Sequence, residues 1–173
     1  MRVPQTMRRL ILTAHIVTSV GWLGAVIAYL ALDVAASASQ DTATIRAAYL
    51  GMDLTIRTVI APLAVVSVLI GIVSALTSQW GLFTHYWVLV KLLLTLFATL
   101  ILLLEVQNIR WLAELASTSA DPRNLPGSLV HSVGGLIILL TIAILSVYRP
   151  RGLTPRGWRA QQRIASEGGS RGG

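Results

Sequence analysis

Five ionisable residues lie within long apolar segments or at their ends, and their side chains are of types that bind ligands or exchange protons. They are His15, Arg57, Lys91, Glu105 and His131. Ionisable groups are costly inside a bilayer, and they usually face the interior of a helix bundle or a functional pathway. We therefore take these five positions as the candidate site residues.

His15 and Lys91 form the first candidate pair. Each lies about 9 Å inside its segment at the helical rise of about 1.5 Å per residue, so we expect them at one level near the cytoplasmic side. Imidazole exchanges protons near neutral pH and binds metals. Lys91 is the only lysine and, unlike arginine, can lose its proton when buried, which suits a catalytic group, a counter-ion or an amine ligand. The alternatives are that Lys91 extends toward the headgroups and that His15 only hydrogen-bonds to a neighbouring helix.

Arg57, Glu105 and His131 form a second, outer polar level. Glu105 ends the third apolar segment, Arg57 begins the second, and His131 lies just inside the fourth. We expect Arg57 and Glu105 to be a boundary ion pair or ordinary interfacial charges, and His131 to have a structural role. The helical rise separates the levels of the two histidines by roughly 10–15 Å. The two histidines are therefore not expected to hold one iron atom between them.

The segments that carry these residues predict a membrane protein. Hydrophobic residues make up 54% of the chain and charged residues 12%, against about 25% charged in soluble domains. Four apolar blocks have the roughly 20 residues that a helix needs to cross the bilayer, and none alternates as a barrel strand does. We predict an all-α integral membrane four-helix bundle with helices at about 8–33, 54–78, 86–115 and 126–148. A cleaved signal peptide is the alternative for the first block, but signal sequences have shorter apolar regions of about 7–15 residues.

Arginines concentrate at both ends of the chain and predict its orientation. By the positive-inside rule, both termini are cytoplasmic in a multi-pass protein of the cell inner (plasma) membrane. Residues 1–148 form the predicted transmembrane domain, and residues 149–173 form a basic tail whose composition predicts disorder. We expect this tail to contact anionic lipid headgroups and not nucleic acid.

Small or polar residues recur every seven positions and indicate which helix faces turn inward. The first predicted helix carries His15, Trp22 and Tyr29, and the second carries Arg57, Ala64, Gly71 and Ser78. A bundle turns such faces together.

Two short motifs resemble known membrane families. The segment from His15 through Trp22 to Gly24 resembles the first-helix His…Trp-x-Gly pattern of the copper resistance protein D membrane domain and of HemJ-type membrane protoporphyrinogen oxidase. The Trp87…Lys91 spacing is similar to a Trp-x-x-x-Lys pattern of the oxidase. The resemblance implies a haem b site with His15 as iron ligand, Trp22 beside it, and Lys91 as a cofactor-side or catalytic group. The chain lacks the family's proline-arginine segment after the first helix and its histidine between Trp87 and Lys91.

The sequence thus leaves several classes of function open. One is a haem-b redox protein or oxidase-like enzyme, and another is a cofactor-free accessory or structural membrane protein. A small transporter or copper-handling protein is a third, although the chain has no cysteine and only three methionines, so soft copper ligands are scarce. A second copy of the chain or another membrane protein is an expected partner.

Overall fold

A computed structural model describes residues 4–77 and 85–148, together with residues 152, 154, 155, 158, 159 and 162. Its elements are α1 (Gln5–Ala38), α2 (Thr42–Thr55), the π-helix η1 (Ile56–Ile60), α3 (Ala61–Thr77), α4 (Tyr86–Thr118), the 3-10 helix η2 (Pro122–Asn124) and α5 (Leu129–Tyr148). Because α2, η1 and α3 follow one another without a break, the described residues contain four helices long and apolar enough to span a membrane. The predicted all-α four-helix architecture is confirmed.

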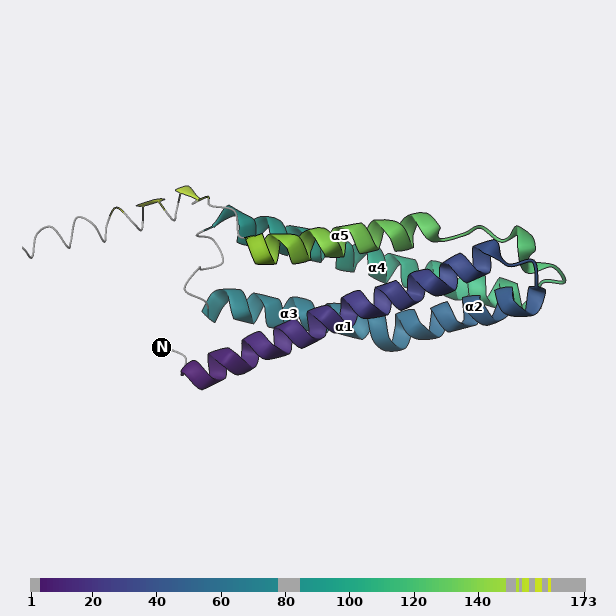
Figure 1. The fold of residues 1–173 in the computed structure, drawn as a ribbon, viewed down its shortest axis with the longest axis horizontal. Helices are drawn as coiled ribbons and strands as arrows, with labels where there is room; N and C mark the ends of the chain where they lie inside the picture. The colour runs from purple at the N-terminus through teal and green to yellow at the C-terminus, as the bar shows by residue number, and fades with distance from the viewer. Residues whose placement is uncertain are drawn as a thin grey trace, which may run out of the picture.

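The four spans form a ring in which α1 and α4 each pack on both α3 and α5. One end of the bundle, which we call the terminal end, holds the start of α1, the end of α3, the start of α4 and the end of α5 (Figure 1). The opposite end, the loop end, holds the short α1–α2 connection and the longer α4–α5 connection (Figure 1).

Three of the spans are longer than predicted. The first helix was expected to end at residue 33 but continues to Ala38, and the second was expected to begin at residue 54 but begins at Thr42. At about 1.5 Å per residue, the 34 residues of α1 measure about 51 Å, well beyond the roughly 30 Å of hydrocarbon. Hydropathy predicts only the part of a helix that lies within the hydrocarbon. These helices continue beyond that part because they pack on one another there.

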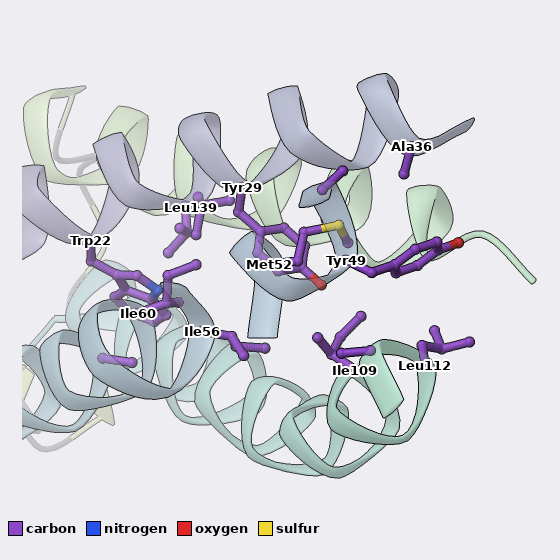
Figure 2. Packing of buried hydrophobic residues seen from close by; sticks show 14 of the residues in the cluster. Trp22, Tyr29, Ala36, Tyr49, Met52, Ile56, Ile60, Ile109, Leu112 and Leu139 are labelled. Carbon is purple, nitrogen blue, oxygen red and sulfur yellow. The ribbon is translucent and has the colours of Figure 1, made fainter. Parts of the chain in front are cut away.

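The most deeply buried core lies in the loop-end half of the bundle. Met52 and Ile109 are 0% exposed and Ile60 is 1% exposed, and these side chains belong to one buried cluster that extends along the inside of the bundle (Figure 2). On the outside of the bundle, large apolar side chains such as Leu93 and Val130 are exposed. Extensive exposed apolar surface is typical of a chain whose outer face meets lipid.

The π-helix η1 changes the register of the second span. Its last turn is closed by the amide of Ala61, which donates to the carbonyl of Ile56, one residue further back than in an α-helix. Pro62 follows directly, and a proline inside a helix removes an amide and crowds the preceding turn. One additional residue rotates the following helix by about 100° relative to the preceding one. The predicted seven-residue stripe from Arg57 to Ala64 and Gly71 is therefore broken after Arg57.

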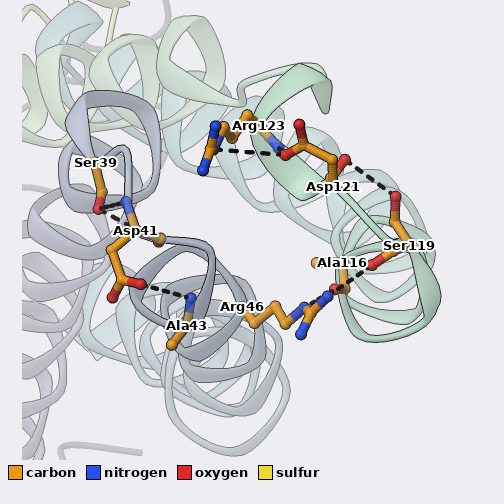
Figure 3. A network of polar contacts seen from close by, with 8 residues as sticks. All are labelled: Ser39, Asp41, Ala43, Arg46, Ala116, Ser119, Asp121 and Arg123. Atoms are coloured by element: carbon orange, nitrogen blue, oxygen red, sulfur yellow. Dashed lines mark hydrogen bonds and ion pairs between the residues drawn. The ribbon is translucent and has the colours of Figure 1, made fainter.

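Polar contacts fasten the helix ends together at the loop end (Figure 3). Asp41 caps α2 by accepting from the amides of Ala43 and Thr44. Arg46 of α2 crosses to the end of α4, where Nε donates to the carbonyl of Ala116 at 3.1 Å and Nη2 to that of Ser119 at 2.8 Å. These carbonyls belong to the last turn of α4, whose acceptors have no partner within the helix.

The fourth span ends at Tyr148, where the sequence predicted its end. Most of the predicted tail, residues 149–173, lies outside the described residues, and so does the prediction that it is disordered. Within its described part, the carbonyl of Gly152 accepts from the amide of Tyr86 at 3.2 Å, and Thr154 is buried.

Candidate functional site

His15 lies between α1 and α3 in the terminal-end half of the bundle. Its imidazole is directed at the backbone of Ser67 and packs on Gly71, where a Cβ atom would stand only 2.9 Å from Cε1. Nδ1 is buried and has no hydrogen-bond partner within the described part of the chain. Lys91 of α4 lies close enough to act electrostatically on His15. The structure thus places His15 and Lys91 near each other.

Trp22 lies seven residues after His15 on α1, closer to the middle of the bundle, and its surroundings differ from those of His15. It is 3% exposed, and its Nε1 is buried without a partner among the described residues. With Tyr29 it lines a central cavity of about 70 Å³. His15 and Lys91 are not part of the lining, so the structure separates Trp22 from the other two residues that the haem resemblance grouped together.

The central cavity is enclosed by all four spans. Its lining is Trp22, Val26, Tyr29, Ile56, Ile60, Ala98, Ile101, Leu102, Glu105, His131, Ser132, Gly135 and Leu139. Ionisable or hydroxyl groups come from Tyr29, Glu105, His131 and Ser132, and the remainder is apolar apart from the indole nitrogen of Trp22. Since Glu105 and Ser132 lie nearer the loop end than Ala98 and Leu139 on their helices, the cavity is polar toward the loop end and apolar toward the middle of the bundle.

Glu105 and His131 of the predicted outer level lie together. His131 Nδ1 stands 3.8 Å from Glu105 Oε1, and the histidine side chain is 52% exposed whereas that of Glu105 is 13% exposed. The pair therefore connects the cavity with the surface between α4 and α5. Asn108 also donates to Glu105, at 3.1 Å.

Arg57 does not join this pair, so the first of the two expectations for Arg57 and Glu105, a boundary ion pair between them, is not met, whereas the second, ordinary interfacial charges, stays open. Its guanidinium pairs with Asp53, one turn earlier on the same helix, and its side chain is 47% exposed. The π-helix accounts for the difference, because it rotates Arg57 away from the inward face that Ala64 and Gly71 occupy further along. Asp53 Oδ1 is buried without a hydrogen-bond partner in the described segments.

The most buried ionisable side chain is one that sequence reasoning missed. Asp33 of α1 is 0% exposed. Its Oδ2 accepts from the hydroxyls of Ser128 at 2.8 Å and Ser132 at 2.5 Å, and its Oδ1 has no partner among the described residues. The predicted first helix ended at residue 33, which left Asp33 at the membrane edge.

A signal for Asp33 was present in the sequence. The buried residues of α1 are Trp22, Val26, Tyr29, Asp33 and Ala36. These alternate by four and three positions, which is the spacing of one inward helical stripe. Continuing the stripe from Trp22 and Tyr29 by one turn places Asp33 on the inner face.

The length and apolar composition of the four helices define the class: the protein is a multi-pass integral membrane protein with four helical spans. No protein-family model, curated protein or solved structure matches the chain.

The fit of a haem can be judged from the geometry. His15 packs directly on Gly71, and the cavity of about 70 Å³ lies elsewhere. An engineered cavity of about 150 Å³ admits benzene, and a haem is far larger than one benzene ring. An open apolar groove of about 350 Å³ does lie beside His15, but the imidazole is not part of its lining, which is Leu10, Ile11, Ala14, Leu69, Ile70 and Val73. The described residues around His15 therefore do not form a haem pocket in this conformation. Within the same residues, no three His, Asp or Glu side chains gather as metal ligands.

Proposed function

We propose that the protein lies in the inner (plasma) membrane with both termini cytoplasmic, and that it binds a lipophilic molecule from the bilayer in its central cavity. The observation that carries this proposal is the polarity of the cavity. Ligand sites are mostly apolar with a few well-placed polar groups, and the lining combines apolar residues with Glu105, His131 and Ser132.

The cavity is polar toward the loop end and apolar toward mid-span, which is the order of head and chain in an amphiphile that lies in one leaflet. Glu105 and His131 lie toward the loop end, near the first turn of α5, and Ala98 and Leu139 lie toward mid-span. A molecule with a polar head at the interface and a chain toward the bilayer centre fits this order. A hydroxyl or amine head would donate to the carboxylate of Glu105, whereas a carboxylate head would be repelled.

The size of the cavity limits what enters it. At about 70 Å³, it is roughly half the size of the cavity that admits benzene. It therefore accommodates the head and first atoms of a longer molecule. The half-exposed His131 favours a path between α4 and α5, through which the remaining chain would extend into the lipid.

Trp22 provides the test because it lines the cavity and is shielded from the surface. The protein is reconstituted into vesicles with a dibrominated long-chain alcohol, and its fluorescence quenching is compared with that of Trp22→Phe to isolate Trp22. We expect quenching by the alcohol and less by the matching brominated fatty acid. Equal quenching of Trp22 by both, or none by either, would contradict the proposed head-group preference.

Two neighbouring glycines give a matched pair for this experiment. Gly135 lines the cavity and Gly134 does not, and a Cβ atom at either position meets nothing within 4 Å. Gly135→Leu should fill the cavity and abolish quenching of Trp22, whereas Gly134→Leu should leave it unchanged. If both variants were quenched like the parent protein, the ligand would not occupy the cavity.

Haem b bound through His15 is the second candidate. The buried Nδ1 of His15 without a partner among the described residues and the proximity of Lys91 favour it, but α1 and α3 would have to separate to admit the macrocycle. It predicts a Soret band in purified protein that is lost in His15→Ala. Colourless protein purified from haem-replete cells would exclude haem binding. The remaining functions would then be binding of a lipophilic molecule in the central cavity or a cofactor-free accessory role.

A further inference from the structure

Asp33 places a carboxyl group in the interior, where it forms no ion pair within the described residues. Asp33 is 0% exposed. Hydroxyl groups of Ser128 and Ser132 approach only one of its two oxygens. An isolated buried carboxylate is very unfavourable, and proteins usually neutralise it.

The groups around Asp33 come from every helix packed against it. The neighbours of Asp33 are Tyr29 on the same helix, Tyr49 on α2 and Ser128 on the connection before α5. Glu105 on α4 lies near Tyr29, as Asp33 does. None of these groups is a cation. His131 beside Glu105 becomes cationic only when protonated.

The hydrogen bonds at Asp33 suit both the charged and the neutral carboxyl group. Serine hydroxyls donate or accept by rotating. When the carboxyl is ionised, both serines donate to Oδ2; when it carries a proton, Oδ2–H donates to Ser132 at the same 2.5 Å separation. Ser132 then still has the carbonyl of Leu129 as an acceptor at 3.2 Å. A proton is thus added or removed without repacking the helices.

Exchangeable groups also connect Asp33 with the surface. His131 is half exposed and contacts Glu105. Tyr29 lines the same cavity as Glu105, His131 and Ser132. It lies one turn from Asp33 on the inner face of α1. Ser132 also bonds to Asp33. Carboxyl and imidazole groups form proton relays in membrane proteins, and a tyrosine hydroxyl can both donate and accept a proton.

We propose that Asp33 is a proton-exchange site inside the membrane domain, reached from the surface through His131, Glu105 and Tyr29. A proton from water binds the imidazole of His131, which then passes a proton to the carboxylate of Glu105. Glu105 transfers this proton to the hydroxyl oxygen of Tyr29 while the original hydroxyl proton of Tyr29 moves to Asp33. His131, Glu105 and Tyr29 end unchanged, and the new O–H bond on Asp33 changes the charge of that carboxyl from −1 to zero. Release reverses these transfers. The inference depends on the contacts of Asp33 and not on a ligand in the cavity.

Infrared difference spectroscopy of the full chain in lipid vesicles tests this proposal. A pH step should change a carboxylic-acid carbonyl band that shifts in D₂O, and Asp33→Asn should abolish it. Asp53→Asn is the matched control, because Asp53 is also buried but pairs with Arg57; the band should persist there. Glu105→Gln should keep the band and slow its response to the pH step.

Two further measurements keep the test decisive. Carbon-13 labelling of aspartate in the parent protein should shift the band, which identifies an aspartate even if Asp33→Asn does not fold. Thermal unfolding with Na⁺, K⁺ or choline chloride distinguishes a proton from an alkali cation. A missing band, or a band unaffected by Asp33→Asn, would overturn the proposal. Stabilisation by Na⁺ or K⁺ that disappears in Asp33→Asn would replace it with a cation site.

Discussion

Replacing Arg46 with alanine should destabilise the loop end of the bundle more than any other single arginine substitution in the described helices. The guanidinium makes two hydrogen bonds to carbonyls at the end of α4, at 3.1 and 2.8 Å. Arg46 is the side chain that joins α2 to the last turn of α4 in this way. Alanine leaves the carbonyl of the fully buried Ala116 without its charged donor.

The expected loss can be worked out from these contacts. A hydrogen bond to a charged group contributes about 1.5–3 kcal/mol, and a partly exposed one contributes less because water replaces it. We therefore expect a net loss of about 2–3 kcal/mol in the free energy of unfolding for Arg46→Ala. For a chain of this size, each 1 kcal/mol lowers Tm by about 2–4 °C, so Tm should fall by about 4–12 °C.

Arg110 supplies the control. It pairs with Glu114 one turn away, with side chains 58% and 67% exposed, and such pairs contribute about 0.3–0.5 kcal/mol. Thermal unfolding in detergent micelles should therefore show Arg110→Ala within about 2 °C of the parent protein. Arg46→Lys should be intermediate, since an ammonium group cannot reproduce both bonds. An Arg46→Ala variant as stable as Arg110→Ala would refute the reasoning.

Three other substitutions or conditions give equally direct expectations. Gly71→Ala should cost about 1–3 kcal/mol, because the new Cβ would stand 2.9 Å from His15 Cε1 and overpacking costs this much. Met52→Ala should cost about 2–5 kcal/mol, because Met52 is 0% exposed. Hydrogen bonds from the hydroxyl and amide of Thr44 lower the pKa of Asp41. The stability that Asp41 contributes should thus be complete above pH about 4 and be lost as the pH falls through its lowered pKa.

Each of these expectations has a control measured by the same unfolding assay. Gly24→Ala should not destabilise, since a Cβ there meets nothing within 4 Å. Leu54→Ala should change stability by about 0.5 kcal/mol or less, because Leu54 is 59% exposed. Asp41→Asn should remove the share of the acid dependence that Asp41 contributes, so the unfolding curve should depend less on pH below about 4. A destabilised Gly24→Ala, a large loss in Leu54→Ala, or an unchanged acid limb in Asp41→Asn would contradict the respective argument.

Hydropathy was sufficient to predict the four spans, because a membrane requires long apolar helices whatever their packing. It was not sufficient to predict their ends. Residues 42–53 carry polar side chains beside Ile45, Tyr49 and Met52, so the segment resembles a loop by its average hydropathy. Its apolar face is buried against α1 and α4, and only this packing explains why the helix begins at Thr42.

The candidate site was predicted in part. Glu105 and His131 were expected at one level and lie 3.8 Å apart, because their depth depends only on helical rise. Arg57 was assigned to the same level because it begins the second predicted span, and its expected inward direction came from a seven-residue spacing that a π-helix interrupts. Asp33 was overlooked because its inward direction follows from a stripe that extends beyond the apolar run. Depth along a helix was therefore predictable, whereas rotation about its axis depended on local irregularities.

The unequal lengths of the spans have a consequence for mapping the protein in its membrane. With 20 residues, α5 measures about 30 Å and matches the hydrocarbon thickness, whereas α1 and α4 extend about 20 Å further at 34 and 33 residues. A protease acting from the loop-end side would meet a helical projection with two connections between α-helices within reach, at residues 39–41 and 119–128, the second of which includes η2. Cleavage confined to these two short stretches would reveal both the sidedness of the protein and the height of its projection above the lipid.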